Sequence, residues 1–159
     1  MKTLYLMRHA KAGRGDGALS DFDRPLTSRG ANDASLIGLQ LKQNEMVPQA
    51  IIASAATRTL STAQIIAPYV ANTPIHQSKS LYLASEHTLL KLVNTLQEEL
   101  TSVMLIGHNP GISTLIEDLS GHHSINLTTG GLIELHFKVE NWQEIFPGNG
   151  KIKRSLNPG

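Results

Sequence analysis

The sequence contains no cysteine and few aromatic or charged residues. Without cysteine among its 159 residues, disulfide scaffolds, cysteine zinc sites and thiol nucleophiles are excluded. The chain has three Phe, three Tyr and one Trp, and 17% of its residues are charged, against roughly 25% in ordinary soluble domains. Its 14 basic and 13 acidic residues nearly cancel, so nothing indicates a nucleic-acid-binding protein, which usually carries a clustered basic excess.

Long apolar runs are absent as well. No run approaches the roughly 20 residues that span a bilayer, and the run Thr3–Met7 is too short for the centre of a signal peptide. We therefore expect a cytoplasmic protein that does not enter a membrane. The length fits one domain. We expect residues 1–159 to form it, with 151–159 as a basic C-terminal tail.

Short apolar runs alternate with helical patterns along the chain. Runs typical of buried parallel strands occupy residues 3–7, 50–53 and 102–107. Apolar residues spaced by three and four predict helices over 28–43, 57–70 and 86–100, and a fourth after Pro110. From Gly131 the period changes to two, which predicts an antiparallel strand followed by a second short strand around Trp142. This order predicts an α/β sheet covered by helices on both faces.

Basic side chains that suit phosphate follow three of the predicted strands. Arg8 and His9 follow the first, Arg58 lies in the first turn after the second, and His108 follows the third. Ligands of open parallel sheets bind beyond the carboxyl ends of strands, so these residues converge if the strand order permits. Guanidinium groups match phosphate oxygens, and a neutral imidazole can attack phosphorus to form a covalent intermediate. Each residue alone is more typical of a loop; together they favour an anion site.

Four segments occur in the order found in a known family. They are Leu6-Met7-Arg8-His9-Ala10-Lys11, Asp23-Arg24-Pro25-Leu26-Thr27-Ser28-Arg29-Gly30, the spaced set Ser54, Arg58, Thr62 and Ala63, and Gly107-His108-Asn109-Pro110. They resemble the motifs of the histidine phosphatase superfamily, and within it those of the small SixA-type phosphohistidine phosphatases. Two positions depart from the usual pattern: Ala10 stands where Gly is usual, and Ala55 where Pro is common.

The resemblance implies a fold and a set of site residues. The fold is a three-layer α/β/α sandwich with a mostly parallel central sheet, similar to phosphoglycerate mutases but without a large lid insertion. His9 would be the nucleophile that accepts the phosphoryl group. Arg8 and Arg58 would bind the phosphate oxygens, and His108 would bind and polarise the same group. Neither a metal nor an organic cofactor is implied.

Larger relatives carry an acid that protonates the leaving group, and this sequence has no clear counterpart. Glu86 is more typical of an exposed residue in the first turn of a helix. Asp16, Asp21 and Asp23 are more typical of loop or capping residues, so all four remain weak candidates. An alkyl phosphate leaves as a basic alkoxide and needs a proton, whereas the ring of phosphohistidine can bring its own. We therefore expect the substrate to be phosphohistidine on a protein, such as a phosphotransfer domain in a signalling or sugar-transport relay.

Two alternatives remain open at this point. One is a broad phosphomonoesterase acting on small phosphorylated metabolites, which an acid near the leaving oxygen would favour. The other is a non-catalytic phosphoprotein-binding module, although such a module has no need of the nucleophile His9. The sequence identifies neither the partner protein nor the oligomeric state, and a monomer is compatible with it.

Overall fold

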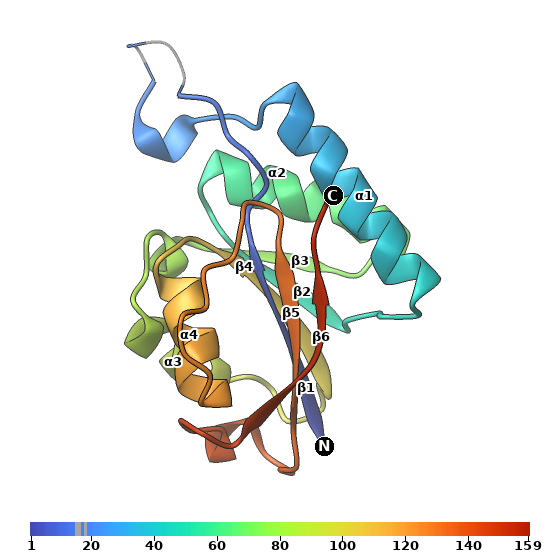
Figure 1. Ribbon diagram of the computed structural model, residues 1–159, viewed down its shortest axis with the longest axis vertical. Coiled ribbons are helices and arrows are strands. Elements are labelled where there is room, and N and C mark those ends of the chain that lie inside the picture. Colours follow the sequence, from blue (N-terminus) through green and yellow to red (C-terminus); the bar gives the residue numbers. More distant parts are fainter. Residues whose placement is uncertain (15–16, 18) are drawn as a thin grey trace.

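The structure is a computed structural model that describes residues 1–14, 17 and 19–159. Six strands form one sheet in the order β3-β2-β4-β1-β5-β6 (Figure 1). The four strands β1 (Lys2–Arg8), β2 (Ala50–Ser54), β3 (Ile75–Ser78) and β4 (Ser102–Gly107) are parallel. β5 (Leu132–Phe137) pairs antiparallel with β1, and β6 (Gly150–Leu156) pairs antiparallel with β5. The expectation of a mostly parallel central sheet is confirmed.

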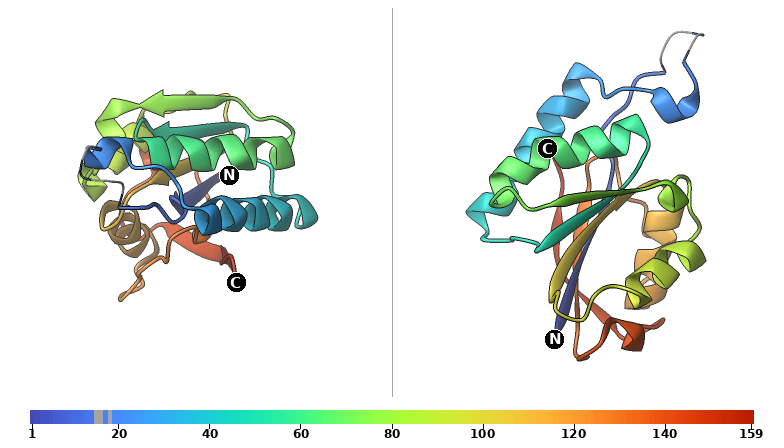
Figure 2. Two further views of the ribbon diagram at one scale, coloured as in Figure 1. Left: turned by 90° about the horizontal axis from the view of Figure 1, so that it is seen from above. Right: turned by 180° about the vertical axis from the view of Figure 1, so that it is seen from behind.

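Helices cover both faces of the sheet. Figures 1 and 2 show α1 (Ser28–Gln43) and α2 (Thr57–Ile66) on one face and α3 (Glu86–Asn94) and α4 (Gly111–Ser120) on the other. Four short 3₁₀ helices are added: η1 (Asp21–Asp23), η2 (Ala67–Val70), η3 (Lys79–Leu81) and η4 (Trp142–Glu144). This is the expected three-layer sandwich, without a large insertion. None of the helices described combines the length and the apolar character that crossing a membrane requires.

The central strand β1 shows why the sheet needs cover on both sides. Its residues Leu4 and Leu6 pack in the core on the side of α3 and α4, whereas Tyr5 and Met7 pack in the core on the side of α1 and α2. All four are buried. Because side chains alternate across a strand, an uninterrupted apolar run is stable only where both faces of the sheet are covered.

Three predicted elements differ from the structure. The helix expected over 57–70 ends at Ile66 and continues as η2, and the helix expected over 86–100 ends at Asn94. The side-chain amide of Asn94 there donates hydrogen bonds to the carbonyls of Trp142 and Ile145. The prediction of a strand around Trp142 is wrong. This residue begins η4 and is fully buried, and its indole N–H donates a hydrogen bond to Leu100 O.

The C-terminal segment is also different from the prediction. The interpretation of residues 151–159 as a tail is wrong, because most of them form the edge strand β6. The register against β5 shifts between Glu134 and Leu135, where a β-bulge leaves Lys153 without a direct partner. An extra residue of this kind breaks the period-two pattern, so the basic sequence of β6 does not resemble an alternating strand.

The strand order brings the predicted site together. β2, β4 and β1 are neighbours, and their carboxyl ends are in register, with Arg8 opposite Gly107 and Ala53 opposite Ile106. The loops after these three strands therefore start side by side. The strand order therefore allows the predicted site residues to lie close together.

Candidate active site

All four predicted site residues lie at this edge of the sheet. Arg8 ends β1 and His9 follows it, Arg58 lies in the first turn of α2, and His108 directly follows β4. The rings of His9 and His108 are 5.3 Å apart between centroids. His9, Arg58 and His108 are buried, with 8%, 3% and 3% of their surface exposed. The structure therefore gathers two imidazoles and two guanidinium groups in one place.

His9 is fixed through its backbone and through one ring nitrogen. Its amide donates to Gly107 O at 3.1 Å, and its carbonyl accepts from Gly130 N at 3.0 Å. Its Nδ1 lies 2.7 Å from Ala10 O. Since a carbonyl oxygen can only accept, Nδ1 carries the hydrogen and the lone pair of the neutral ring is on Nε2.

His108 shares a hydrogen bond of 2.8 Å between its Nε2 and Ser54 Oγ, the last residue of β2. Ser54 Oγ in turn accepts from Ala56 N at 3.3 Å. The other ring nitrogen, Nδ1 of His108, is buried and makes no hydrogen bond within the described part of the chain. A buried polar atom without a partner is unusual in a native protein, and such an atom at the end of a sheet marks a place where a polar ligand can bind.

Arg8 is held by the loop between α4 and β5. Its Nη1 donates to Leu127 O at 3.0 Å, and Gly130 N donates to the carbonyl of Arg8 at 3.2 Å. The Nε of Arg8 is also buried, with no hydrogen-bond partner among the described residues. The segment 127–131 thus fixes the side chain and leaves donor capacity on the guanidinium.

Arg58 is oriented by Asp21, which arrives from the loop after β1. Nη1 of Arg58 donates to Asp21 O at 2.7 Å and Nη2 donates to Asp21 Oδ2 at 3.0 Å. A guanidinium group has five N–H donors, so three remain after these two bonds. Asp21 therefore holds one edge of Arg58 and leaves the rest of the group available to an anion.

Tyr82 is a site residue that the sequence analysis missed. Its hydroxyl donates to Asp21 Oδ2, and its ring stands edge to face against His108 at 5.5 Å and against Phe22 at 5.0 Å. The Cζ of Arg58 lies 6.0 Å from the centre of the same ring. A tyrosine in the turn before α3 gives no chemical signal by itself, because its role depends on contacts with the distant segment 21–22.

Burial and nearby arginines keep both histidines neutral. Burial, together with the charges of Arg58, Arg8 and Arg24, lowers the pKa of His9 to about 4, against the opposing effect of the bond to the Ala10 carbonyl. Burial and the charge of Arg58 lower the pKa of His108 to about 3. Burial also lowers the pKa of the Arg8 guanidinium, which stays far above neutrality. At pH 7 the site thus combines neutral imidazoles with cationic guanidinium groups.

Of the candidate acids that the structure describes, only Asp21 contacts the site residues. Hydrogen bonds from Tyr82, Arg24 and Arg58 hold the pKa of its carboxyl well below the usual range, so Asp21 is ionised and carries no proton to donate. Asp23 accepts a hydrogen bond from Ser20 within its own loop, and Glu86 pairs with the neighbouring His87 at 3.7 Å. Asp16 lies outside the described residues.

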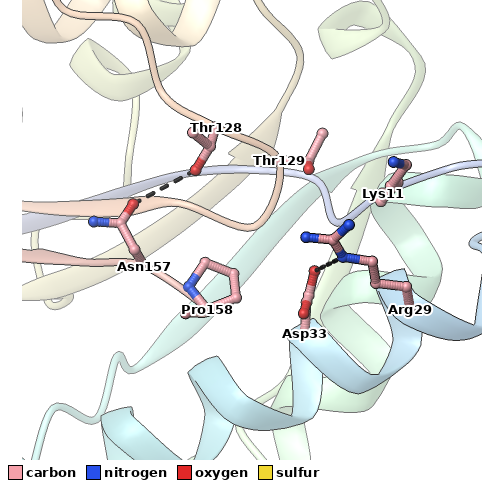
Figure 3. Close-up of a pocket in the computed structure, with 8 residues that line it drawn as sticks. Lys11, Arg29, Asp33, Thr128, Thr129, Asn157 and Pro158 are labelled. Carbon is pink, nitrogen blue, oxygen red and sulfur yellow. Dashed lines mark hydrogen bonds and ion pairs between the residues drawn. The ribbon is translucent and has the colours of Figure 1, made fainter.

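None of the four central site residues lines the polar cavity that lies between α1, the segment 128–129 and the C-terminus. It has a volume of about 580 Å³ and is bordered by Lys11, Arg29, Asp33, Thr128, Thr129, Asn157, Pro158 and Gly159. Figure 3 shows Arg29 turned toward Asp33, an ion pair of 3.9 Å, and Thr128 toward Asn157. Its charges are therefore partly paired within the protein. Among the described residues, no three His, Asp or Glu side chains are grouped as metal ligands.

Comparison with known proteins identifies the family. Residues 4–82 match the family model described as "Histidine phosphatase superfamily (branch 1)". An uncharacterized protein of Mycobacterium tuberculosis is 31% identical over 152 residues, which cover 89% of this chain and 93% of that protein.

Solved structures agree with this match. The crystal structure of a candidate phosphohistidine phosphatase SixA from Agrobacterium tumefaciens is 29% identical, with a TM-score of 0.86 over 99% of this chain and 98% of the other. The protein histidine phosphatase SixA complexed with tungstate, 23% identical with a TM-score of 0.79 over 98% and 97% of the two chains, shows the same fold. The resemblance that the sequence motifs indicated is confirmed, and the chain belongs to the histidine phosphatase superfamily, as a member of the SixA type.

Proposed function

We propose that this protein is a metal-independent phosphatase that hydrolyses phosphohistidine carried by another protein, through a covalent intermediate on His9. One observation carries the proposal. A buried and neutral His9, with its Nδ1 hydrogen held by the Ala10 carbonyl, lies beside His108 and two guanidinium groups. A phosphoryl-transfer site needs a nucleophile with a free lone pair and hydrogen-bond donors for the phosphate oxygens, and these residues supply both.

In the first step, Nε2 of His9 attacks phosphorus, and the bond between phosphorus and the substrate's imidazole nitrogen breaks. Arg8 and Arg58 bind the non-bridging oxygens and stabilise their charge in the transition state. His108 contributes from Nδ1: in the tautomer that serves this step, the hydroxyl of Ser54 donates its hydrogen to Nε2, and Nδ1 carries a hydrogen for a phosphate oxygen. In the second step, water attacks the phosphorus, the bond between phosphorus and His9 Nε2 breaks with its electron pair returning to Nε2, and inorganic phosphate is released.

Two features support a protein-borne phosphohistidine as the substrate. Asp21, the carboxylate at the site, is ionised and therefore does not protonate a basic alkoxide, whereas an imidazole leaving group needs no such help. Large apolar side chains are also exposed beside the site residues in sequence: Leu19 is 44% and Leu83 is 56% exposed. Contact with a partner protein would cover these two side chains.

The test offers the purified protein a phosphohistidine-bearing phosphotransfer domain, p-nitrophenyl phosphate and a sugar phosphate, each with and without chelator. We expect the phosphohistidine protein to be dephosphorylated fastest, at a rate that chelator does not change. Rapid quench should trap an acid-labile, alkali-stable label. His9→Ala should abolish both the label and the turnover.

The matched control is His87→Ala, because the His87 side chain is 90% exposed on α3 and should leave both readouts unchanged. Faster turnover of sugar phosphates than of phosphohistidine would contradict the proposed substrate and favour a phosphomonoesterase. Activity that survives His9→Ala, or that disappears with chelator, would contradict the mechanism. Binding of the phosphoprotein without any turnover would indicate a non-catalytic module.

A further inference from the structure

The outer rim of the site consists of Asp21, Phe22 and Tyr82, and the mechanism above assigns it no role. Asp21 is exposed, with 45% of its side-chain surface accessible, while Phe22 and Tyr82 are half-buried. By contrast, His9, Arg58 and His108 are buried. The rim therefore lies between the buried phosphate-binding groups and the solvent.

The geometry of phosphoryl transfer determines which part of the substrate lies at this rim. The nucleophile and the leaving group lie on opposite sides of phosphorus when a phosphoryl group is transferred in line. Because His9 attacks from the buried side, the leaving group points outward. Tyr82 is in contact with His108, Phe22 and Asp21 at once, so a leaving group above the phosphate site meets its ring and the neighbouring carboxylate.

Asp21 has acceptor capacity left for such a group. Its Oδ2 accepts from Arg58 and Tyr82, and its Oδ1 accepts from Arg24 Nη1 at 2.9 Å. An ionised carboxylate offers about four lone-pair sites, so one more donor can bind at Oδ1. Its backbone bond to Arg58 and the bond of Arg24 Nε to Gly13 O, 2.6 Å long, hold the carboxylate at the site.

We infer that the rim binds the imidazole leaving group: Asp21 accepts the N–H of the ring nitrogen remote from phosphorus, and Tyr82 and Phe22 contact the cationic ring. The inference rests on the proposed function and makes these residues determinants of specificity. A cationic ring is attracted both by a carboxylate and by aromatic faces. The rim thus has the polarity and the shape of a site for protonated phosphohistidine.

The proton balance follows from this placement. The substrate ring enters with a hydrogen on its remote nitrogen and with phosphorus on the other. When the phosphorus–nitrogen bond breaks, its electron pair goes to the nitrogen that held phosphorus, and the new bond forms at His9 Nε2. The ring leaves as neutral imidazole with its remote hydrogen still in place, and Asp21 remains ionised throughout. The bonds that lower the pKa of Asp21 agree with this role as an acceptor.

The same carboxylate disfavours ester substrates. An oxygen leaving group gains negative charge as its bond to phosphorus breaks, and a nearby carboxylate repels that charge. Removing the charge of Asp21 should therefore slow the reaction of a phosphoimidazole more than that of an aryl phosphate. A role limited to orienting Arg58 would instead slow both reactions alike, since both substrates present the same phosphoryl group.

The experiment compares kcat/KM for phosphoimidazole and for p-nitrophenyl phosphate in the wild type, Asp21→Asn, Tyr82→Phe and a matched control, Asp23→Asn. Asp23 lies two residues from Asp21 and pairs with Ser20. We expect Asp21→Asn to lower the ratio of the two rates, phosphoimidazole over ester, by at least about tenfold, the equivalent of about 1.4 kcal/mol. Tyr82→Phe, which removes one hydrogen bond to Asp21, should lower the ratio less, and Asp23→Asn should not change it.

The outcomes separate this inference from the proposed function. Equal loss of both activities in Asp21→Asn, or an unchanged ratio, overturns the leaving-group site while the wild-type activity on phosphoimidazole still supports the function. A wild type that cleaves only the ester overturns the proposed function and this inference with it. Should Asp21→Asn fail to fold, the ratio measured for Tyr82→Phe decides in the same way, and an unchanged ratio there overturns the role of the rim.

Discussion

Mild acid should destabilise this protein through the two site histidines. In the folded chain the pKa values of His9 and His108 are lowered to about 4 and about 3, whereas an unfolded histidine titrates near ~6.5. Below that value the unfolded chain binds more protons than the folded chain. Stability is therefore fully present at neutral pH and falls as the pH drops below about 6.5.

The size of the effect follows from the same pKa values. Each histidine contributes a slope of about 1.4 kcal/mol per pH unit between its unfolded and folded pKa. From pH 7 to pH 5 the pair should cost on the order of 4 kcal/mol, out of the roughly 5–15 kcal/mol that stabilise a typical domain. Asp21 adds nothing in this range, because the stability gained from its lowered pKa is lost only as the pH falls below the ordinary value of 3.8.

Urea unfolding followed by Trp142 fluorescence measures this slope, since Trp142 is the only tryptophan and is fully buried. The free energy of unfolding is compared at pH 7, 6 and 5 in the wild type, His9→Gln, His108→Gln and the exposed control His87→Gln. Each site variant should lose about half of the wild-type dependence, and the control none. Identical slopes in all four proteins would refute the assignment of buried, neutral histidines.

Two further predictions concern the groups around the site. Ser54→Ala removes the hydrogen bond to His108 Nε2. Steady-state kinetics with phosphoimidazole should therefore show a drop in kcat/KM of about 3- to 10-fold. An unchanged kcat/KM would mean that Ser54 does not set the tautomer of His108. Gly111 begins α4 against the Ala84 carbonyl, where a Cβ would overlap the backbone oxygen. Gly111→Ala should therefore lower the free energy of unfolding, measured in urea, by roughly 1–3 kcal/mol. An unchanged unfolding midpoint would show that Ala84 can move away from Gly111 at no cost in stability.

Much of the fold could be predicted because its elements carry strong local patterns. The helix over 28–43 has the predicted bounds, its N-cap Thr27 accepts from Gly30 N, and its buried face contains Ala34, Ile37, Gly38 and Leu41 at helical spacing. β3 was missed because an edge strand with one apolar residue, Ile75, has little to bury. β6 was missed because its bulge removes the alternation of side chains.

The site was predictable where side chains directly follow strands and not where loops pack on one another. Arg8, His9 and His108 are positioned by the ends of β1 and β4, which a pattern of apolar runs locates. The contact of Tyr82 with Asp21 joins residues 61 positions apart in two irregular segments. No periodicity describes such a pair; the packing of Phe22 against Tyr82 and the hydrogen bond from Tyr82 to Asp21 bring the two segments together.

The place of β1 in the sheet also determines when the candidate site can assemble during synthesis. Although it is the first strand made, β1 pairs only with β4 and β5, so that Arg8 lies opposite Gly107 and Lys2 opposite Phe137. During synthesis by a ribosome, His9 emerges early, and the strands β4 and β5 that pair with β1 emerge much later. Pairing across such long sequence separations is intrinsically slow. The candidate site therefore cannot assemble until β4 and β5 have been synthesised.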